Sequence, residues 1–154
     1  IQEVAGVVES CGLDLVQLCG KESVEYAGQV GCGVIKVVHV AETATATDDA
    51  AIGGRVKDFS GVGHLVTLDR YVEGIQGGTG KGFDWDVAAS LSQGGHLFLL
   101  AGGLTPENVS DAITAVKPWG VDVSSGVETD GNKDHAKIRD FMHKARSTAK
   151  LING

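Results

Sequence analysis

Two stretches rich in glycine and serine, both in the last third of the chain, have the residue types of a phosphate site. Gly102-Gly103 follows one apolar run, and Ser124-Ser125-Gly126 follows the next. Glycines let backbone N–H groups face a phosphate closely, and a serine hydroxyl adds a further donor. Either stretch alone could simply form a tight turn from a strand into a helix. The two together favour phosphate binding if the fold brings them to one rim.

Two aspartates in or beside apolar runs are candidate site residues. Asp69 ends an apolar run, and a carboxylic acid can act as a general acid where its surroundings raise its pKa towards the working pH. On the residues alone, Asp69 could equally cap a loop or pair with Arg70. Asp122 lies within the last apolar run, where a buried carboxyl is costly without a partner. On the residues alone, we expect Asp122 to make a structural hydrogen bond within the fold.

These candidates depend on five short apolar runs, which we interpret as buried strands of a parallel sheet. The runs are Leu13–Leu18, Val34–Val40, His64–Leu68, Leu97–Ala101 and Gly120–Val123. The intervals between them predict helices over Glu22–Val30, Asp48–Asp58 and Asp84–Gln93.

The fourth interval and the tail give the clearest helical patterns. Thr105 suits an N-cap and Pro106 the first helical position, and Pro118 marks the stop. Apolar residues then follow helical spacing in this interval (Val109, Ala112, Ile113, Val116), in the tail (Ile138, Phe141, Met142, Ala145) and at the start of the chain (Val4, Val7, Val8).

Alternating strands and helices predict an α/β fold, either an open doubly wound sheet or a TIM barrel. The glycine-rich stretches follow the last three strands, as phosphate loops do in (β/α)8 barrels, so we favour the barrel. Residues 1–154 would form part of a single barrel domain. Because the chain opens at Ile1 inside a helical pattern, we expect an incomplete barrel that carries only the later strands.

Charge and composition exclude several other classes. The net charge of −7 argues against a nucleic-acid footprint or a basic membrane face. The sequence holds no apolar run of about 18 residues and no signal-peptide pattern. The three cysteines lack metal-ligand spacing, and the five histidines are scattered. We expect a reduced, cytoplasmic setting with no metal, nucleic acid or membrane partner.

Four motifs in order resemble phosphoribosylanthranilate isomerase, and the resemblance covers almost the whole chain. They are Leu15 to Glu22, Gln76 to Trp85 with Gly78, Leu100 to Val109, and Val121 to Glu128. The tail from Gly131 to the last helix also fits. By family order the five strands correspond to strands four to eight of the barrel. The sequence resembles the fungal members most, and these are often fused to other tryptophan-pathway domains.

The resemblance implies an Amadori rearrangement in tryptophan biosynthesis without a cofactor. N-(5-phosphoribosyl)anthranilate becomes 1-(2-carboxyphenylamino)-1-deoxyribulose 5-phosphate through acid-assisted ring opening and loss of the C2′ proton to a base. It implies that Asp69 is the general acid and that Asp122 contacts the anthranilate part. It also implies that Gly78, Gly102, Gly103, Ser124, Ser125 and Gly126 bind the phosphorylated substrate.

The sequence departs from the family at the base. The family uses a cysteine in a Lys-x-Cys-Gly motif on its first strand, and an arginine for the anthranilate carboxylate. That motif is not present, and Cys19 aligns instead with a histidine of the fourth-strand motif. We therefore expect this chain alone to be inactive or nearly so.

Two other functions remain open. One is a related ribose-phosphate barrel enzyme such as indole-glycerol-phosphate synthase, although the lysine and glutamates of that family are not evident. The other is a non-catalytic, phosphate-binding or self-associating half barrel, because two open sheet edges would seek partners.

Overall fold

The computed structural model describes residues 1–41, 48–71 and 85–153. Five parallel strands form one sheet in the order β1-β2-β3-β4-β5. Their bounds are β1 (Leu15–Leu18), β2 (Gly33–Ala41), β3 (Leu65–Tyr71), β4 (Leu99–Leu100) and β5 (Gly120–Val121). A doubly wound sheet would reverse its order part-way, whereas a barrel adds each strand beside the previous one. The sheet therefore has barrel-type winding.

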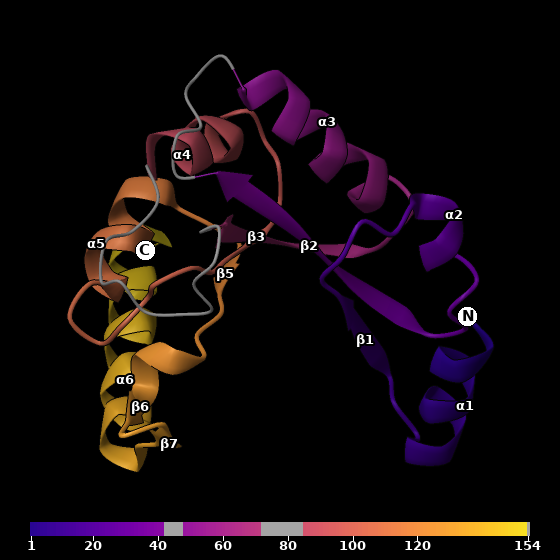
Figure 1. Ribbon diagram of the computed structural model, residues 1–154. Coiled ribbons are helices and arrows are strands. Elements are labelled where there is room, and N and C mark those ends of the chain that lie inside the picture. Colours follow the sequence, from indigo (N-terminus) through magenta and orange to yellow (C-terminus); the bar gives the residue numbers. More distant parts are fainter. Residues whose placement is uncertain (42–47, 72–84, 154) are drawn as a thin grey trace.

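The helices lie on one side of the sheet, along the outside of an arc (Figure 1). They are α1 (Gln2–Cys11), α2 (Val24–Ala27), α3 (Asp49–Ser60), α4 (Trp85–Gln93), α5 (Val109–Val116) and α6 (His135–Asn153). Short elements follow β5: the 3₁₀ helix η1 (Ser125–Val127) and the hairpin β6 (Glu128–Thr129) with β7 (Asn132–Lys133). Within the described ranges β1 and β5 lie at opposite edges, so the sheet does not close there.

The helix α5 shows how the apolar pattern builds the core. Its four predicted apolar positions, Val109, Ala112, Ile113 and Val116, are all buried. Thr105 begins the turn before the helix, where its hydroxyl accepts a hydrogen bond from Glu107 N at 3.2 Å, and the regular helix starts later. Lys117 ends it in a left-handed conformation with φ 51°, directly before Pro118.

The strands β2 and β3 carry the centre of the core. In β2 the residues at even positions, from Val34 to Val40, face the helices and are buried. Lys36 is among them, so the helix side of this strand is not purely apolar. Residues at odd positions, such as His39, face the inside of the arc.

The predicted elements all occur, with shifted boundaries. Strand β5 is shorter than predicted, so Asp122 lies just beyond it. Met142 and Val7, predicted on apolar helix faces, are 42% and 49% exposed. Within the three described ranges, no helix is both long and apolar enough to cross a membrane.

Candidate active site at the carboxyl ends of the strands

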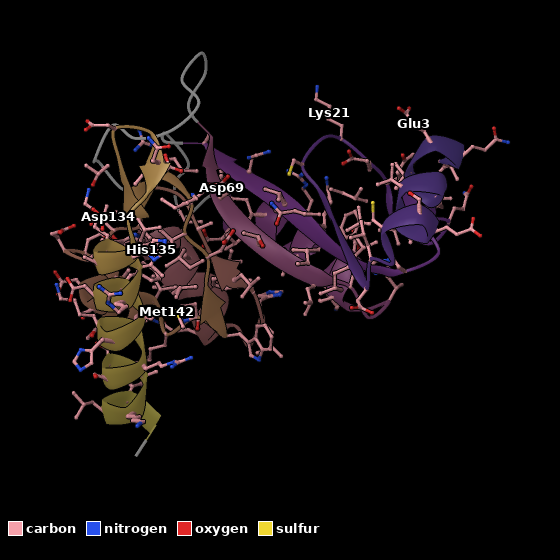
Figure 2. All side chains as sticks on the ribbon, turned by 90° about the horizontal axis from the view of Figure 1, so that it is seen from below. Glu3, Lys21, Asp69, Asp134, His135 and Met142 are labelled. Atoms are coloured by element: carbon pink, nitrogen blue, oxygen red, sulfur yellow. The ribbon has the colours of Figure 1, made fainter. Side chains whose placement is uncertain are left out.

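Asp69 lies near the carboxyl end of β3, in the middle of the arc (Figure 2). Its partner across the β2–β3 pair is His39. The ladder continues past β4, because Ala101 N donates to Leu68 O at 2.8 Å and Asp122 N donates to Leu100 O at 2.9 Å. His39, Asp69, Ala101 and Asp122 therefore form one row across four neighbouring chain segments, on the inner face of the sheet. The small side chain of Ala101 separates the two carboxyl groups.

The surroundings of Asp69 favour its protonated form. Partial burial raises the pKa of this carboxyl above its ordinary value, and the negative charge of Asp122 acts in the same direction. A cationic His39 and the Arg70 backbone N–H lower it, but burial outweighs both. A carboxyl whose pKa is raised above its ordinary value has the property that a general acid needs.

The loop after β4 approaches Asp69 so closely that only glycine fits at its start. Gly102 and Gly103 have φ of 88° and 75°, a backbone region that residues with side chains rarely adopt. A Cβ on Gly102 would lie 2.7 Å from Arg70 N and 3.1 Å from Asp69 Oδ1. The loop is braced by Asn108, which donates to Gly103 O at 3.0 Å and accepts from Thr105 N at 2.8 Å.

The loop after β5 contacts the loop after β4 directly. Gly126 lies in η1, and a Cβ there would overlap the carbonyl oxygen of Leu104. The expectation that the two glycine-containing loops share one rim is thereby confirmed. Their role in phosphate binding stays a prediction.

A lysine and a glutamate hold the second loop in place. Lys133 Nζ lies 2.9 Å from Ser124 O, 3.3 Å from Ser124 Oγ and 2.6 Å from Glu128 Oε1. Lys137 Nζ donates to Glu128 O at 2.6 Å. The hairpin β6–β7 and the start of α6 thus fix the serine that was predicted to face the phosphate.

The remaining predicted site residues are Asp122, Gly78, Ser124 and Ser125. Asp122 is exposed, so its predicted burial is wrong, because β5 ends at Val121 and does not include it. Gly78 lies outside the described residues. Ser124 and Ser125 are both exposed at the same rim.

Cys19 follows the carboxyl end of β1. Cys19 is exposed after β1, and its Sγ accepts from Gln17 Nε2 at 3.6 Å. Across the part of the chain that the structure describes, no group of three or more His, Cys, Asp or Glu side chains could hold a metal ion.

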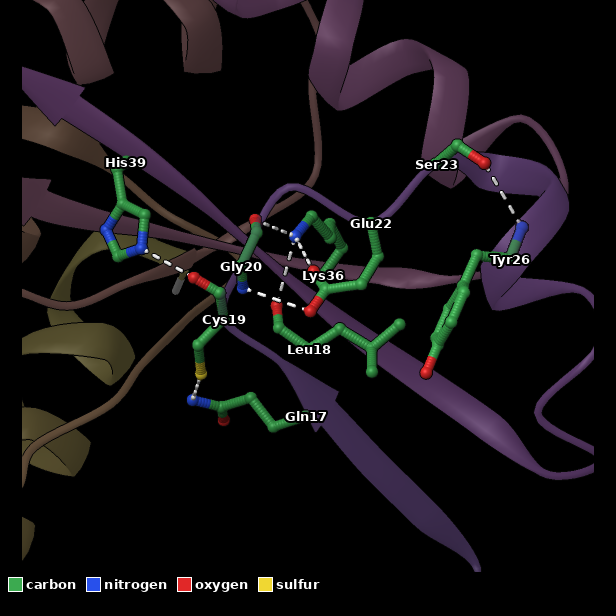
Figure 3. A network of polar contacts seen from close by, with 9 residues as sticks. All are labelled: Gln17, Leu18, Cys19, Gly20, Glu22, Ser23, Tyr26, Lys36 and His39. Carbon is green, nitrogen blue, oxygen red and sulfur yellow. Dashed lines mark hydrogen bonds and ion pairs between the residues drawn. The ribbon is translucent and has the colours of Figure 1, made fainter. Parts of the chain in front are cut away.

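Sequence reasoning gave no role to His39 or Lys36, which the structure places close to the site. Lys36 Nζ binds the loop after β1 through Leu18 O, Gly20 O and Glu22 Oε2 (Figure 3). His39 Nε2 lies 2.9 Å from Cys19 O. The signal in the sequence that could have indicated them is a charged residue and a histidine inside an otherwise apolar strand.

Comparison with known proteins assigns this arrangement to a family. The family described as N-(5'-phosphoribosyl)anthranilate (PRA) isomerase matches residues 1–144. The chain belongs to the PRA isomerase family. The isomerase of Roseiflexus castenholzii is 47% identical over 151 residues, which are 97% of this chain and 68% of that protein.

Solved structures of PRA isomerases share the fold. The Thermotoga maritima enzyme superposes with a TM-score of 0.78 at 34% identity, over 95% of this chain and 68% of that chain. A second structure, in complex with reduced 1-(o-carboxyphenylamino)-1-deoxyribulose 5-phosphate, gives a TM-score of 0.72 at 30% identity over 95% of this chain and 66% of that one.

The predicted membership in the PRA isomerase family is thus confirmed. This is a family of isomerases of tryptophan biosynthesis. The chain spans about two thirds of the length of the curated relatives it matches. The match extends over nearly all of this chain, and nothing in it singles out the fungal members. The interpretation as the later part of an incomplete barrel stays a prediction.

Proposed function

We propose that this chain carries the phosphate-binding and acid half of a PRA isomerase site, with Asp69 as the general acid. The observation that carries the proposal is the meeting of Asp69 with the two glycine-containing loops at one rim of the sheet. Gly102, in the loop after β4, lies against the Asp69 carboxylate. Gly126, in the loop after β5, lies against Leu104 of the loop after β4. A phosphate held by these loops would set the sugar of the substrate beside a partly buried acid.

The division of roles follows from the chemistry of each position. Backbone N–H groups of Gly102, Gly103 and Gly126, with the hydroxyls of Ser124 and Ser125, suit a phosphate. Asp69 would protonate the ribose ring oxygen and open the ring. Asp122, exposed in the same row as Asp69, would contact the anthranilate part. Gly78 belongs to the proposed set through its motif alone.

Binding of a product analogue tests the site without requiring turnover. Reduced 1-(o-carboxyphenylamino)-1-deoxyribulose 5-phosphate is bound in a solved family structure, so it is a suitable probe in isothermal titration calorimetry. We expect one site per chain, weakened by inorganic phosphate as a competitor. No detectable binding by the folded chain would refute the proposal.

Two glycine variants give a matched comparison for this test. In Gly126→Ala the new Cβ meets the Leu104 carbonyl, so the two loops must separate and affinity should fall at least tenfold. In Gly54→Ala, on the outer helix α3, no atom lies within 4 Å of the new Cβ, so affinity should not change. Equal affinity in Gly126→Ala and the wild type would remove these loops from the site.

Turnover is a separate prediction. Since the sequence contains no Lys-x-Cys-Gly motif, we expect this chain alone to convert N-(5-phosphoribosyl)anthranilate at the background rate. The assay follows the loss of substrate fluorescence, with a full-length relative as the positive control. Turnover comparable to that relative would show that another group in this chain acts as the base.

The PRA isomerase proposal leaves two expectations about partners. The first is self-association through the strand edges, and the second is fusion to further tryptophan-pathway domains. Both stay predictions, as does a cytoplasmic location.

A further inference from the structure

His39 stands directly opposite Asp69 on the inner face of the sheet. Its ring is half-buried, and its Nε2 lies 2.9 Å from the carbonyl oxygen of Cys19. A carbonyl oxygen only accepts, so this hydrogen bond requires the proton on Nε2. The bond therefore selects the Nε2–H tautomer of the neutral ring.

The loop that carries the Cys19 carbonyl is fixed by a buried lysine. Lys36 is 1% exposed, and its Nζ donates to Gly20 O at 2.7 Å, to Leu18 O at 3.3 Å and to Glu22 Oε2 at 2.7 Å. These carbonyls flank Cys19 on both sides. Figure 3 shows the continuous set of contacts from Lys36 through the loop to His39. Three acceptors satisfy the ammonium, which makes its burial tolerable.

We propose that His39 is a positioning residue for Asp69, held in place by the loop that Lys36 anchors. The proposal rests on the proposed function, because the purpose of the arrangement is to prepare the acid of the isomerase site. The loop sets the ring orientation, and the ring supplies a positive charge beside the carboxyl when Nδ1 is protonated. That charge stabilises the carboxylate that Asp69 becomes after it donates its proton.

Charged groups of opposite sign face Asp69 from its two sides. His39 faces it from β2, and Asp122 faces it from the segment after β5. The loop after β4 contributes Gly102, which carries no charge, and the neighbouring Arg70 contributes its backbone N–H. Burial and Asp122 raise the pKa of Asp69, whereas His39 lowers it. His39 therefore limits the effect of burial and keeps the acid able to release its proton.

Carbon-detected NMR titration of the aspartate carboxyls tests the proposal directly. The Asp69 resonance is assigned by its loss in Asp69→Asn. In His39→Gln the amide can still donate to the Cys19 carbonyl, but no charge can form, so the pKa of Asp69 should rise. In Asp122→Asn it should fall. His143→Gln removes an exposed histidine of α6 and should leave the pKa of Asp69 as in the wild type.

The outcomes separate this proposal from the proposed function. An unchanged Asp69 pKa in a folded His39→Gln variant would refute the positioning role, and so would an equal rise in His143→Gln. Binding of the reduced product analogue is measured on the same samples. A chain that shows the predicted shifts but binds no analogue supports the His39–Asp69 pairing and overturns the isomerase site instead.

Discussion

At the scale of single residues, the site is defined by a carboxyl whose protonation is set by position. Asp69 is half-buried, with His39 opposite and Gly102 against one of its oxygens. An acid that is easier to protonate in the folded state than in the unfolded chain costs stability when it is ionised. The property that suits Asp69 to proton donation therefore weakens the fold at neutral pH.

Asp69→Asn should accordingly raise the free energy of unfolding at pH 7. The pKa of Asp69 is raised on folding, so its favourable contribution is present below the unfolded value and is lost as pH rises through the folded value. The gain from asparagine should disappear as pH falls below about 4, where the unfolded aspartate also protonates. Urea denaturation at both pH values measures this.

Asp14→Asn serves as the control for that measurement, because Asp14 is exposed just before β1. It should change stability little at either pH. A loss of stability in Asp69→Asn at pH 7 would mean that the carboxylate makes hydrogen bonds worth more than the cost of its burial.

Residue types in the sequence indicated Asp69 and the two glycine-containing loops, because a carboxyl and glycines at strand ends are local signals. The partners of these residues were not evident. Lys36 lies 14 residues from Glu22, and His39 lies 20 residues from Cys19, so their contacts exist only after β1 and β2 pair. Asp122 was wrongly assigned to a buried strand, because apolar neighbours do not reveal where a strand ends.

At the scale of elements, the conformation of the loop after β1 is held by one ion pair, whose lysine is buried and whose glutamate is partly exposed. Lys36 is 1% exposed and the Glu22 side chain is 25% exposed. Removal of the glutamate leaves a buried ammonium with two carbonyl acceptors, whereas removal of the lysine leaves a carboxylate that water can reach. Glu22 therefore contributes more to stability than its partly exposed position suggests.

Glu22→Gln should lower the free energy of unfolding by about 1.5–3 kcal/mol at pH 7, the usual range for a hydrogen bond to a charged group. The hydrogen bond from Lys36 is the main cause of the lowered pKa of Glu22. Its contribution is present above the unfolded pKa and is lost as pH falls through the folded one. The difference between wild type and variant should shrink in acid, as chemical denaturation at pH 7 and pH 3 would show.

Glu9→Gln changes an exposed glutamate of α1 and should show neither effect. If Glu22→Gln lowered the free energy of unfolding equally at both pH values, the loss would come from packing rather than from the ion pair.

The two adjacent glycines of α3 separate helix propensity from packing. A Cβ on Gly54 meets nothing within 4 Å, so Gly54→Ala should stabilise by about 0.5–1 kcal/mol through the backbone entropy of the unfolded chain. A Cβ on Gly53 would lie 3.1 Å from Leu91 Cδ2 and 3.2 Å from His96 Nε2. Gly53→Ala should therefore gain less or destabilise. Thermal unfolding of both variants measures the contrast, and equal gains would mean that α4 yields to the extra methyl.

The sequence predicted the apolar face of α5, since apolar periodicity is a local signal, but the predicted N-cap Thr105 is wrong, because the regular helix has Asn108 as its N-cap. By helix propensity alone, the glycine pair of α3 weakens the helix. In the structure Gly53 is buried and lets α3 pack closely on α4, which no single-helix pattern could reveal.

At the scale of the whole molecule, strand order is the feature that links the fold to its family. Sequential parallel strands bring the carboxyl ends of β3, β4 and β5 to one rim, and all the proposed site residues in the described ranges lie there. The sequence indicated parallel strands, but their order follows from long-range pairing. The same order leaves β1 with a single neighbour, β2, within the described part of the sheet.

That edge gives a prediction about assembly. The backbone groups on the open side of β1 can pair with another strand, and Leu15 on this strand is 48% exposed. We expect the wild type to self-associate as concentration rises, measured by light scattering.

Leu15→Lys should shift the population towards the 15.9 kDa monomer, because a charged side chain on an edge strand opposes strand addition. Val62→Lys places the same charge at an exposed residue after α3 and should not alter assembly. A wild type that stays monomeric at every concentration would show that the edge of β1 does not recruit a second copy.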